Sequence, residues 1–250
     1  MHPHTRRCLS GLLFPIVWGR CTGRWLPAPQ QSHERRSPLA KFLVVLDVDS
    51  TLIENEVIEL LAAHAGSEPE VTEITTRAMN GELDFEESLR ARVATLAGLP
   101  ARVLEECGRD IQVTNGAREM IQAVTTAGGH VAAVSGGFHE LLDPLARSLG
   151  LRFARANRLE VVSGALTGSV LGPVIDAQAK ANALIEWAAE SDIPLSRTIA
   201  VGDGANDLLM MKAAALSVGI TAKPIVRANA DAHIDTRDLS AILPLLGLRG

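Results

Sequence analysis

The sequence has 250 residues, of which 47% are hydrophobic and 21% are charged, a balance typical of a globular protein with a large core. Its net charge of -5 and aromatic content of 3% argue against a general nucleic-acid binder, which would show basic patches or aromatic stacking platforms. The three cysteines, Cys8, Cys21 and Cys107, form neither a metal-ligand pattern nor a paired disulfide framework, so we expect a cytoplasmic protein.

Residues 1–39 differ in composition from the rest of the chain. They are rich in arginine and proline, and an apolar run over residues 9–18 follows Arg6 and Arg7 in the manner of a signal peptide. Pro15 interrupts that run, which is also too short to cross a bilayer. We interpret residues 1–39 as a disordered leader outside the fold and expect no membrane partner, with an arginine-rich organellar leader as the alternative.

Continuous apolar runs that end abruptly at polar residues mark the predicted strands. Such runs are typical of strands buried on both faces of a parallel sheet. The predicted strands are residues 42–46, 131–134, 198–201, 216–220 and a short one near 233–235, with a hairpin over 157–170. Helices are predicted over residues 117–126, 179–189 and 207–215. This alternation predicts a doubly wound α/β fold with a mainly parallel sheet, in which ligands bind at the carboxyl ends of the strands.

Residues 53–114 break the alternation and are predicted to be consecutive helices. These helices are residues 56–65, 68–80, 85–96 and 101–107, separated by glycine- or proline-containing stops. We expect a helical cap over residues 53–114, inserted into an α/β core formed by residues 40–52 and 115–250. Met79 and Phe85 of this cap are candidates for closing over a ligand, although core packing would explain them nearly as well.

Two acidic clusters follow predicted strands. Asp47 and Asp49 lie two residues apart directly after the first strand, so in an extended chain their carboxylates point to the same side and need a shared proton or cation. Asp203 follows another buried strand, and Asp207 lies four residues further on. Oxygen-rich sites of this kind suit Mg²⁺. Turns and helix caps would explain each cluster, taken alone, at least as well.

A hydroxyl and a lysine complete the set of polar candidates. The Ser135-Gly-Gly segment follows a predicted strand, where a hydroxyl and flexible backbone amides can hold a phosphate, although a glycine-rich turn is the ordinary explanation. Lys180 lies on the helix before the third strand, and a lone lysine is usually a solvated surface group. His64 and His139 have no recognisable nucleophile or acid partner, so we interpret both as helix-surface residues.

The ordered combination of acid pair, hydroxyl segment, lysine and second acid cluster resembles the haloacid dehalogenase superfamily of phosphatases. No Walker motif is present. Within that superfamily the chain looks like the phosphoserine phosphatases, over residues 41–245. The motifs that carry this resemblance are Asp47–Thr51, Ser135–Phe138, Ala156–Leu159 and Val201–Asp207. Val48 departs from the phenylalanine of many relatives, and we expect its side chain to pack against the core.

The resemblance implies magnesium-dependent hydrolysis of phosphoserine, the last step of serine biosynthesis. It implies that Asp47 is the nucleophile, which forms a phospho-aspartate, and that Asp49 is the general acid and base. It also implies that Mg²⁺ is bound by the Asp47 carboxylate, the Asp49 backbone carbonyl and Asp203, with Asp207 in support. The positions matched to substrate binding are Glu56, Arg92, Ser135, Gly136, Lys180 and Asn206.

Glu56 and Arg92 decide the substrate in this interpretation. A carboxylate pairs with the ammonium group of phosphoserine, and an arginine can bind its carboxylate bidentately. Taken alone, Glu56 also suits the first turn of any helix, and Arg92 suits a solvated surface row.

The alternatives are another small phosphomonoester as substrate, phosphoryl transfer to homoserine, or a noncatalytic phosphate-binding protein. A dinucleotide enzyme is disfavoured, since no G-x-G-x-x-G opens a helix after the first strand. We expect the partner to be a small molecule and the protein to be a monomer or homodimer.

Overall fold

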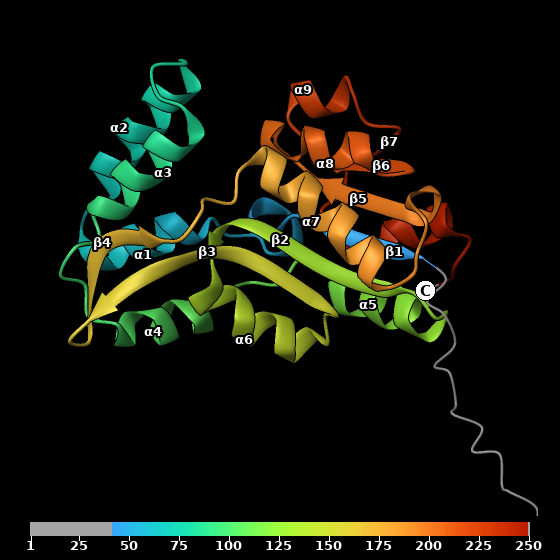
Figure 1. The fold of residues 1–250 in the computed structure, drawn as a ribbon, viewed down its shortest axis with the longest axis horizontal. Helices are drawn as coiled ribbons and strands as arrows, with labels where there is room; N and C mark the ends of the chain where they lie inside the picture. The colour runs from blue at the N-terminus through green and yellow to red at the C-terminus, as the bar shows by residue number, and fades with distance from the viewer. Residues whose placement is uncertain (1–41, 250) are drawn as a thin grey trace, which may run out of the picture. The chain divides into compact units, whose positions relative to one another are not determined.

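The computed structural model describes residues 42–249, so the leader predicted over residues 1–39 lies outside the described residues. Seven strands form one sheet in the order β4-β3-β2-β1-β5-β6-β7. Neighbours are parallel except for β3 and β4, which are antiparallel. The strands are β1 (Leu43–Leu46), β2 (His130–Phe138), β3 (Phe153–Val162), β4 (Ala165–Leu171), β5 (Thr198–Gly202), β6 (Leu216–Ile220) and β7 (Ala232–Ile234). The predicted mainly parallel sheet is confirmed (Figure 1).

Strand β1 lies at the centre of the sheet, and the order of the strands reverses across it. Strands β2 and β3 build outward on one side of β1, whereas β5, β6 and β7 build outward on the other. In open α/β sheets, the crevice at such a switch point, beyond the carboxyl ends of the strands, is the usual ligand site. Asp47 is the first residue after β1 and therefore stands at this point.

Helices cover both faces of the sheet. The helices α5 (Ala117–Thr126) and α6 (His139–Leu149) lie on one face, and α7 (Ala177–Glu190) and α8 (Leu208–Ala213) lie on the other (Figure 1). The short helix α9 (Pro224–Arg227) and a 3₁₀ segment (Leu239–Leu246) follow near the carboxyl terminus. Within residues 42–249, no helix combines the length and the hydropathy that a bilayer span requires.

The side chains of β1 explain why its sequence is apolar without alternation. Val44 and Leu46 belong to the core cluster that contains α5 and α6 residues, whereas Leu43 and Val45 belong to the cluster that contains α7 and α8 residues. Successive side chains of a strand point to opposite faces, and all four are 0% exposed. Burial on both faces therefore demands an apolar residue at every position.

The helical insertion contains the four helices α1 (Val57–Ala65), α2 (Glu68–Met79), α3 (Phe85–Ala94) and α4 (Arg102–Asp110). Its entry and exit lie side by side, because Ile53 bridges Val113. The link between α3 and α4 pairs with the hairpin formed by β3 and β4. The N–H of Gly98 donates to the carbonyl of Leu166, and the N–H of Leu166 donates to that of Leu99, both at 2.8 Å. The hairpin thus supports the insertion, which the sequence did not indicate.

Three local features of the structure differ from what the sequence predicted. The Ser135-Gly-Gly segment is not a turn, because β2 continues through it to Phe138. Helix α6 was not predicted, since it contains Pro144 and a proline argues against a helix interior. His139, at the start of α6, is not a surface residue: its side chain is 20% exposed, and it contacts the Asp143 carboxylate and the backbone N–H of Ala156.

Candidate active site

The turn after β1 aims two carboxylates in different directions. Asp47 Oδ1 accepts the N–H of Val48 at 2.7 Å, and the Val48 side chain is 3% exposed in the core, as expected. Asp49 Oδ1 accepts the N–H of Val57 at the start of α1 at 2.8 Å. Asp49 therefore fulfils the capping role that was the ordinary explanation for this cluster and still faces the site. Ser50 holds a left-handed backbone with φ of 57°, which turns the chain sharply.

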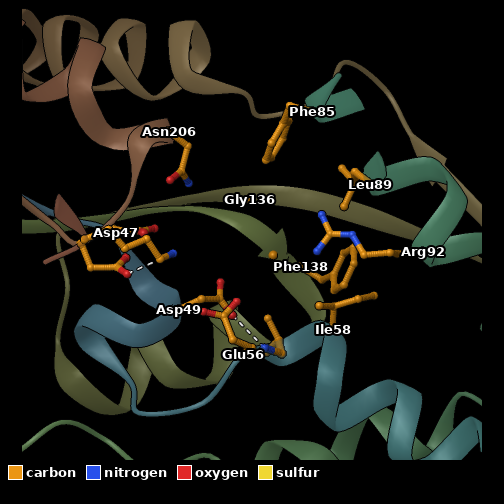
Figure 2. A pocket seen from close by; sticks show the side chains of 14 residues that line it. Asp47, Asp49, Glu56, Ile58, Phe85, Leu89, Arg92, Gly136, Phe138 and Asn206 are labelled. Atoms are coloured by element: carbon orange, nitrogen blue, oxygen red, sulfur yellow. Dashed lines mark hydrogen bonds and ion pairs between the residues drawn. The ribbon is translucent and has the colours of Figure 1, made fainter. Parts of the chain in front are cut away.

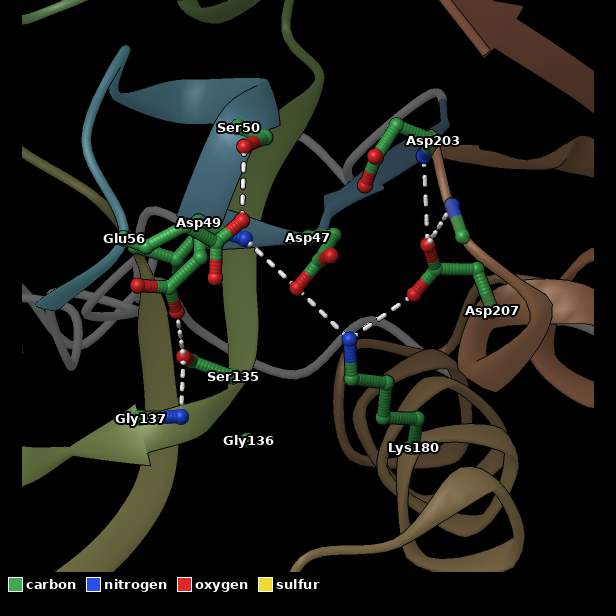
Figure 3. A network of polar contacts seen from close by, with 12 residues as sticks. Asp47, Asp49, Ser50, Glu56, Ser135, Gly136, Gly137, Lys180, Asp203 and Asp207 are labelled. Atoms are coloured by element: carbon green, nitrogen blue, oxygen red, sulfur yellow. Dashed lines mark hydrogen bonds and ion pairs between the residues drawn. The ribbon is translucent and has the colours of Figure 1, made fainter. Parts of the chain in front are cut away.

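Lys180 is the charged centre of the site and is not the solvated surface lysine that its sequence context suggested. It lies on α7 and is 0% exposed. Its Nζ donates to Asp47 Oδ1 at 2.6 Å and to Asp207 Oδ1 at 2.8 Å (Figure 3). Burial alone would lower the pKa of Lys180, but the carboxylates of Asp207 and Asp47 outweigh burial and raise that pKa. The ammonium form therefore persists at every physiological pH.

The second acidic cluster folds around Asp207. Asp207 is 0% exposed, and its Oδ2 accepts the N–H groups of Asp203 at 3.2 Å and Gly204 at 3.0 Å. A Cβ on Gly202 would overlap the Asp207 carboxylate, so only glycine fits there. Burial raises the pKa of Asp203, and the nearby Lys223 opposes that rise, with Lys223 Nζ 3.4 Å from Asp203 Oδ2.

The carboxylates of this region fit a hard divalent cation. Asp47, Asp203 and Asp207 are buried, and each offers an oxygen within 4.8 Å of the others. Burial and the like charge of Asp207 raise the pKa of Asp47 despite Lys180. The ionised form of Asp47 is therefore unfavourable here, and a bound cation would stabilise it. An all-oxygen donor set of this kind suits Mg²⁺ or a similar ion. Both Asp207 oxygens already accept hydrogen bonds, so Asp47 and Asp203 are better placed to be direct ligands.

The glycines after Ser135 permit close approach to Asp49. Ser135 Oγ donates to Asp49 Oδ2 at 2.8 Å and accepts the N–H of Gly137 at 2.7 Å. A Cβ on Gly137 would lie 2.6 Å from Val57 Cγ2, closer than real Cβ atoms approach another atom, and a tight 3.0 Å from Asp49 Oδ2. Glycine is therefore required here by packing within a strand, whereas the sequence suggested a flexible turn.

The pKa of Asp49 is raised, as is that of Asp47. Burial, with a contribution from the negative charge of Glu56, raises the pKa of Asp49 to about 6. The hydrogen bonds from Val57 and Ser135 oppose this rise. A group with this pKa can exchange a proton near neutral pH.

Asp47, Asp49 and Asp203 border one cavity of about 110 Å³ between the sheet and the helical insertion. Figure 2 shows Arg92 on α3 and Glu56 before α1 extending toward the same space as Asp49. The lining residues are Asp47, Asp49, Glu56, Val57, Ile58, Phe85, Leu89, Arg92, Gly136, Gly137, Phe138, Asp203, Asn206 and Lys223. Of the candidate residues, Ser135, Lys180 and Asp207 do not line it. Ser135 donates to Asp49 and Lys180 donates to Asp47, whereas Asp207 accepts from Lys180 and from the backbone N–H groups of Asp203 and Gly204.

The two groups expected to recognise the substrate have partners of their own. Glu56 Oε1 accepts a hydrogen bond from Ser50 Oγ at 2.6 Å. Arg92 Nε donates to the carbonyl of Ser88 at 3.3 Å. Burial lowers the pKa of Arg92, and the negative charge of Glu56 opposes that shift.

Some lining and supporting residues were not found from the sequence. Ser50 lies in the Asp47–Thr51 motif, but its contact with Glu56 was not predicted, and Lys223 carried no signal, because the contact that identifies each one forms only in the fold. Phe85 lines the cavity. Met79 is 83% exposed and lies outside the lining, so core packing does not explain it, and its closing over a ligand stays a prediction. Cys107 is buried, in agreement with a packing role.

Comparisons with known proteins agree with this geometry. Residues 44–212 match the family described as haloacid dehalogenase-like hydrolase. The chain is 53% identical over 209 residues to the phosphoserine phosphatase of Streptomyces coelicolor, an alignment that covers 84% of this chain and 51% of that protein. The chain thus spans about half the length of this curated relative.

Two further relatives match over nearly their whole length. The phosphoserine phosphatase of Lactococcus lactis is 48% identical over 204 residues, covering 82% of this chain and 94% of that protein. A solved structure described as a phospho-aspartyl intermediate analogue of phosphoserine phosphatase has a TM-score of 0.78 and 46% identity, covering 82% of this chain and 99% of that chain.

Replacing Lys180 tests how much the buried ion network contributes to stability. Lys180→Met keeps the length of the side chain but leaves two buried carboxylates without their cation, which should cost about 3–5 kcal/mol of the free energy of unfolding. Urea denaturation in the presence of a chelator measures it. The control, Lys212→Met at an exposed position of α8, should change stability by no more than about 0.5 kcal/mol. Equal effects of the two changes would contradict a stabilising role for Lys180.

Proposed function

We propose a substrate and a reaction from one premise: the chain belongs to the haloacid dehalogenase-like hydrolase family. The proposed reaction is the hydrolysis of O-phospho-L-serine to L-serine and phosphate through a phospho-aspartate. The observation that carries it is that Asp47 and Asp49 border the same small cavity as Glu56 and Arg92. One end of the cavity thus suits a phosphate and the other an amino acid.

The phosphate end requires a cation. A phosphate dianion placed beside Asp47, Asp49 and Asp203 would be repelled by their negative charge. We propose that Mg²⁺ is held by the Asp47 carboxylate, the Asp49 backbone carbonyl and Asp203, with Asp207 as support. When bound, Mg²⁺ supplies charge neutralisation between the carboxylates and the phosphate oxygens. Mg²⁺ is preferred over larger ions because few carboxylates contribute and room must remain for a phosphate oxygen.

Asp47 and Asp49 divide the chemistry between them. An Asp47 oxygen forms a bond to phosphorus while the bond from phosphorus to the serine oxygen breaks, and Asp49 gives its proton to that oxygen. In the second step Asp49 takes a proton from water, the water oxygen bonds to phosphorus, and the bond to Asp47 breaks. Lys180 and Val48 both donate to Oδ1 of Asp47, so these bonds fix the orientation of the carboxylate that reacts.

The remaining groups hold the two ends of the substrate. We propose that the Gly136 amide, the Ser135 hydroxyl, Asn206 and Lys180 bind phosphate oxygens, Lys180 through the third donor of its ammonium group. Glu56, oriented by Ser50, pairs with the substrate ammonium, and Arg92 binds its carboxylate.

The expectations for the whole protein are further proposals. We propose that helices α1 to α4 act as a cap over the core, that the protein is a monomer or homodimer, and that it is cytoplasmic. Its proposed partner is the small-molecule substrate, without nucleic acid or membrane.

A panel of phosphomonoesters, assayed with Mg²⁺ and with a chelator, tests the substrate. Phosphoserine should exceed phosphoethanolamine, which lacks the carboxylate, and phosphoglycolate, which lacks the ammonium, by about 100-fold or more in kcat/KM. Chelation should abolish phosphate release. A result that placed phosphoserine among the poorest substrates would rule out the assignment. Phosphate transferred to added homoserine would favour the phosphotransferase alternative.

Asp47→Asn tests the covalent step. An amide cannot act as the nucleophile, so kcat should fall by at least about 1,000-fold while the circular dichroism spectrum stays unchanged. Asp110→Asn, at an exposed position of α4, should keep wild-type turnover. Wild-type turnover by the Asp47 variant would exclude a phospho-aspartate.

Arg92→Lys tests recognition of the substrate carboxylate. Lysine keeps the charge but loses the bidentate geometry, so KM for phosphoserine should rise about tenfold. The rate with phosphoethanolamine should change little. Arg90→Lys is the matched control, because Arg90 is exposed on the same helix and pairs with Glu86 at 2.7 Å. A similar rise in KM for both substrates would show that Arg92 has only a structural role.

A further inference from the structure

A buried amide outside the reacting groups joins two parts of the site. Asn157 on β3 is 1% exposed, and both ends of its side-chain amide are hydrogen-bonded. Its Nδ2 donates to the carbonyl of Gly136 at 2.8 Å, and its Oδ1 accepts the N–H of Ile175 at 2.8 Å. Asn157 belongs to the Ala156–Leu159 motif, for which the proposed reaction has no role.

These bonds lie where the ladder between β2 and β3 is irregular. Val134 pairs with Arg155, and Phe138 pairs with Asn157, so four steps along β2 match two steps along β3. The two extra residues on β2 lose regular ladder partners, and buried backbone groups need substitutes. The Asn157 amide is the partner of the Gly136 carbonyl.

The peptide unit between Gly136 and Gly137 is held on both sides. Its carbonyl oxygen accepts from Asn157, and its N–H donates to Ser135 Oγ at 2.7 Å. A peptide unit is planar, so fixing both polar groups fixes its orientation. The surroundings are equally tight, since a Cβ on Gly136 would lie 3.0 Å from the Phe85 ring. The Gly136 N–H proposed to bind phosphate is separated from this fixed unit only by the Gly136 Cα, so its placement depends on Asn157.

The other end of the amide reaches the helix that carries Lys180. Ile175 precedes Asp176, the N-cap of α7, whose Oδ1 accepts the N–H of Ala179 at 2.8 Å. Lys180 follows in the first turn of α7. The N–H of Lys180 donates to the carbonyl of Asp176 at 3.0 Å, so the bond from Asn157 to Ile175 limits where Lys180 can lie.

We propose that Asn157 is a positioning residue that holds the Gly136 carbonyl and the start of α7 at a fixed spacing, so that the Gly136 N–H and Lys180 contact the same phosphate group. The proposal rests on the proposed phosphomonoesterase function. Both ends of the Asn157 amide bind backbone groups, so it acts through Gly136 and Lys180. Its loss should therefore weaken phosphate binding more than binding of the amino-acid part.

The test compares two probes, inorganic phosphate and L-serine, by calorimetric titration in the presence of Mg²⁺. Asn157→Asp keeps the size of the side chain and the acceptor for Ile175, but places a carboxylate oxygen against the Gly136 carbonyl. The dissociation constant of phosphate should rise about tenfold, whereas that of L-serine should stay within about twofold. In turnover, kcat/KM for phosphoserine should fall about 100-fold.

Two further variants make the result specific. Asn157→Ala removes both hydrogen bonds and should weaken phosphate binding at least as much as the aspartate variant. Asn182→Asp, at an exposed position of α7, should leave both dissociation constants unchanged.

Several outcomes would overturn the positioning role. Unchanged phosphate affinity, or equal weakening of phosphate and serine binding, would show that Asn157 stabilises the fold without orienting the site. Failure of both Asn157 variants to fold would also overturn it, because the amide would then be a folding requirement. A wild-type protein that binds phosphate but does not hydrolyse phosphoserine would instead refute the proposed function, which keeps the two failures distinguishable.

Discussion

The convergence of buried carboxylates on one buried lysine is the constraint on which this site depends. Lys180 contacts Asp47 and Asp207 with no exposed surface of its own. Like charges at this spacing are unstable without a cation, and a buried cation without partners is equally unfavourable. The polar centre therefore exists only as a complete set, and α7 must lie where its first turn reaches β1. Together with Asp203, these carboxylates outnumber the single ammonium group. The resulting negative charge favours binding of a divalent cation.

Side chains of the site pack closely against the backbone at two glycines. Gly202 makes room for the Asp207 carboxylate, and Gly137 makes room for Val57 and Asp49. In both places a side chain would move a carboxylate that the proposed reaction uses. The irregular ladder between β2 and β3 has the same effect at Gly136, where Asn157 and Ser135 bind the backbone. Glycine and side-chain hydrogen bonds together fix the backbone at this strand end.

In the proposed reaction, recognition of the substrate depends on the helical insertion, and hydrogen bonds tie that insertion to the core. Glu56 is held by Ser50, which follows Asp49 in the turn after β1. Ser50 adopts φ of 57°, a conformation that costs energy for a residue with a side chain. The strain is consistent with a turn that aims both the reacting and the recognition carboxylates. The hairpin of β3 and β4, joined to the link between α3 and α4, supports the other side of the insertion.

The local pattern of the sequence was enough to predict the fold class and to place the acidic residues at the ends of strands. Uninterrupted apolar runs predict doubly buried strands, and a residue such as Asp47 or Asp203 directly after such a run must lie at one edge of the sheet. The sequence could not determine which groups pair across that edge. Lys180 and Asp47 are 133 residues apart, and Lys180 is buried only because sheet order and register bring α7 beside β1. The strand conformation of Ser135–Gly137 and the bonds of Asn157 depend on the same register, since a hydrogen bond requires a partner that only the tertiary structure supplies.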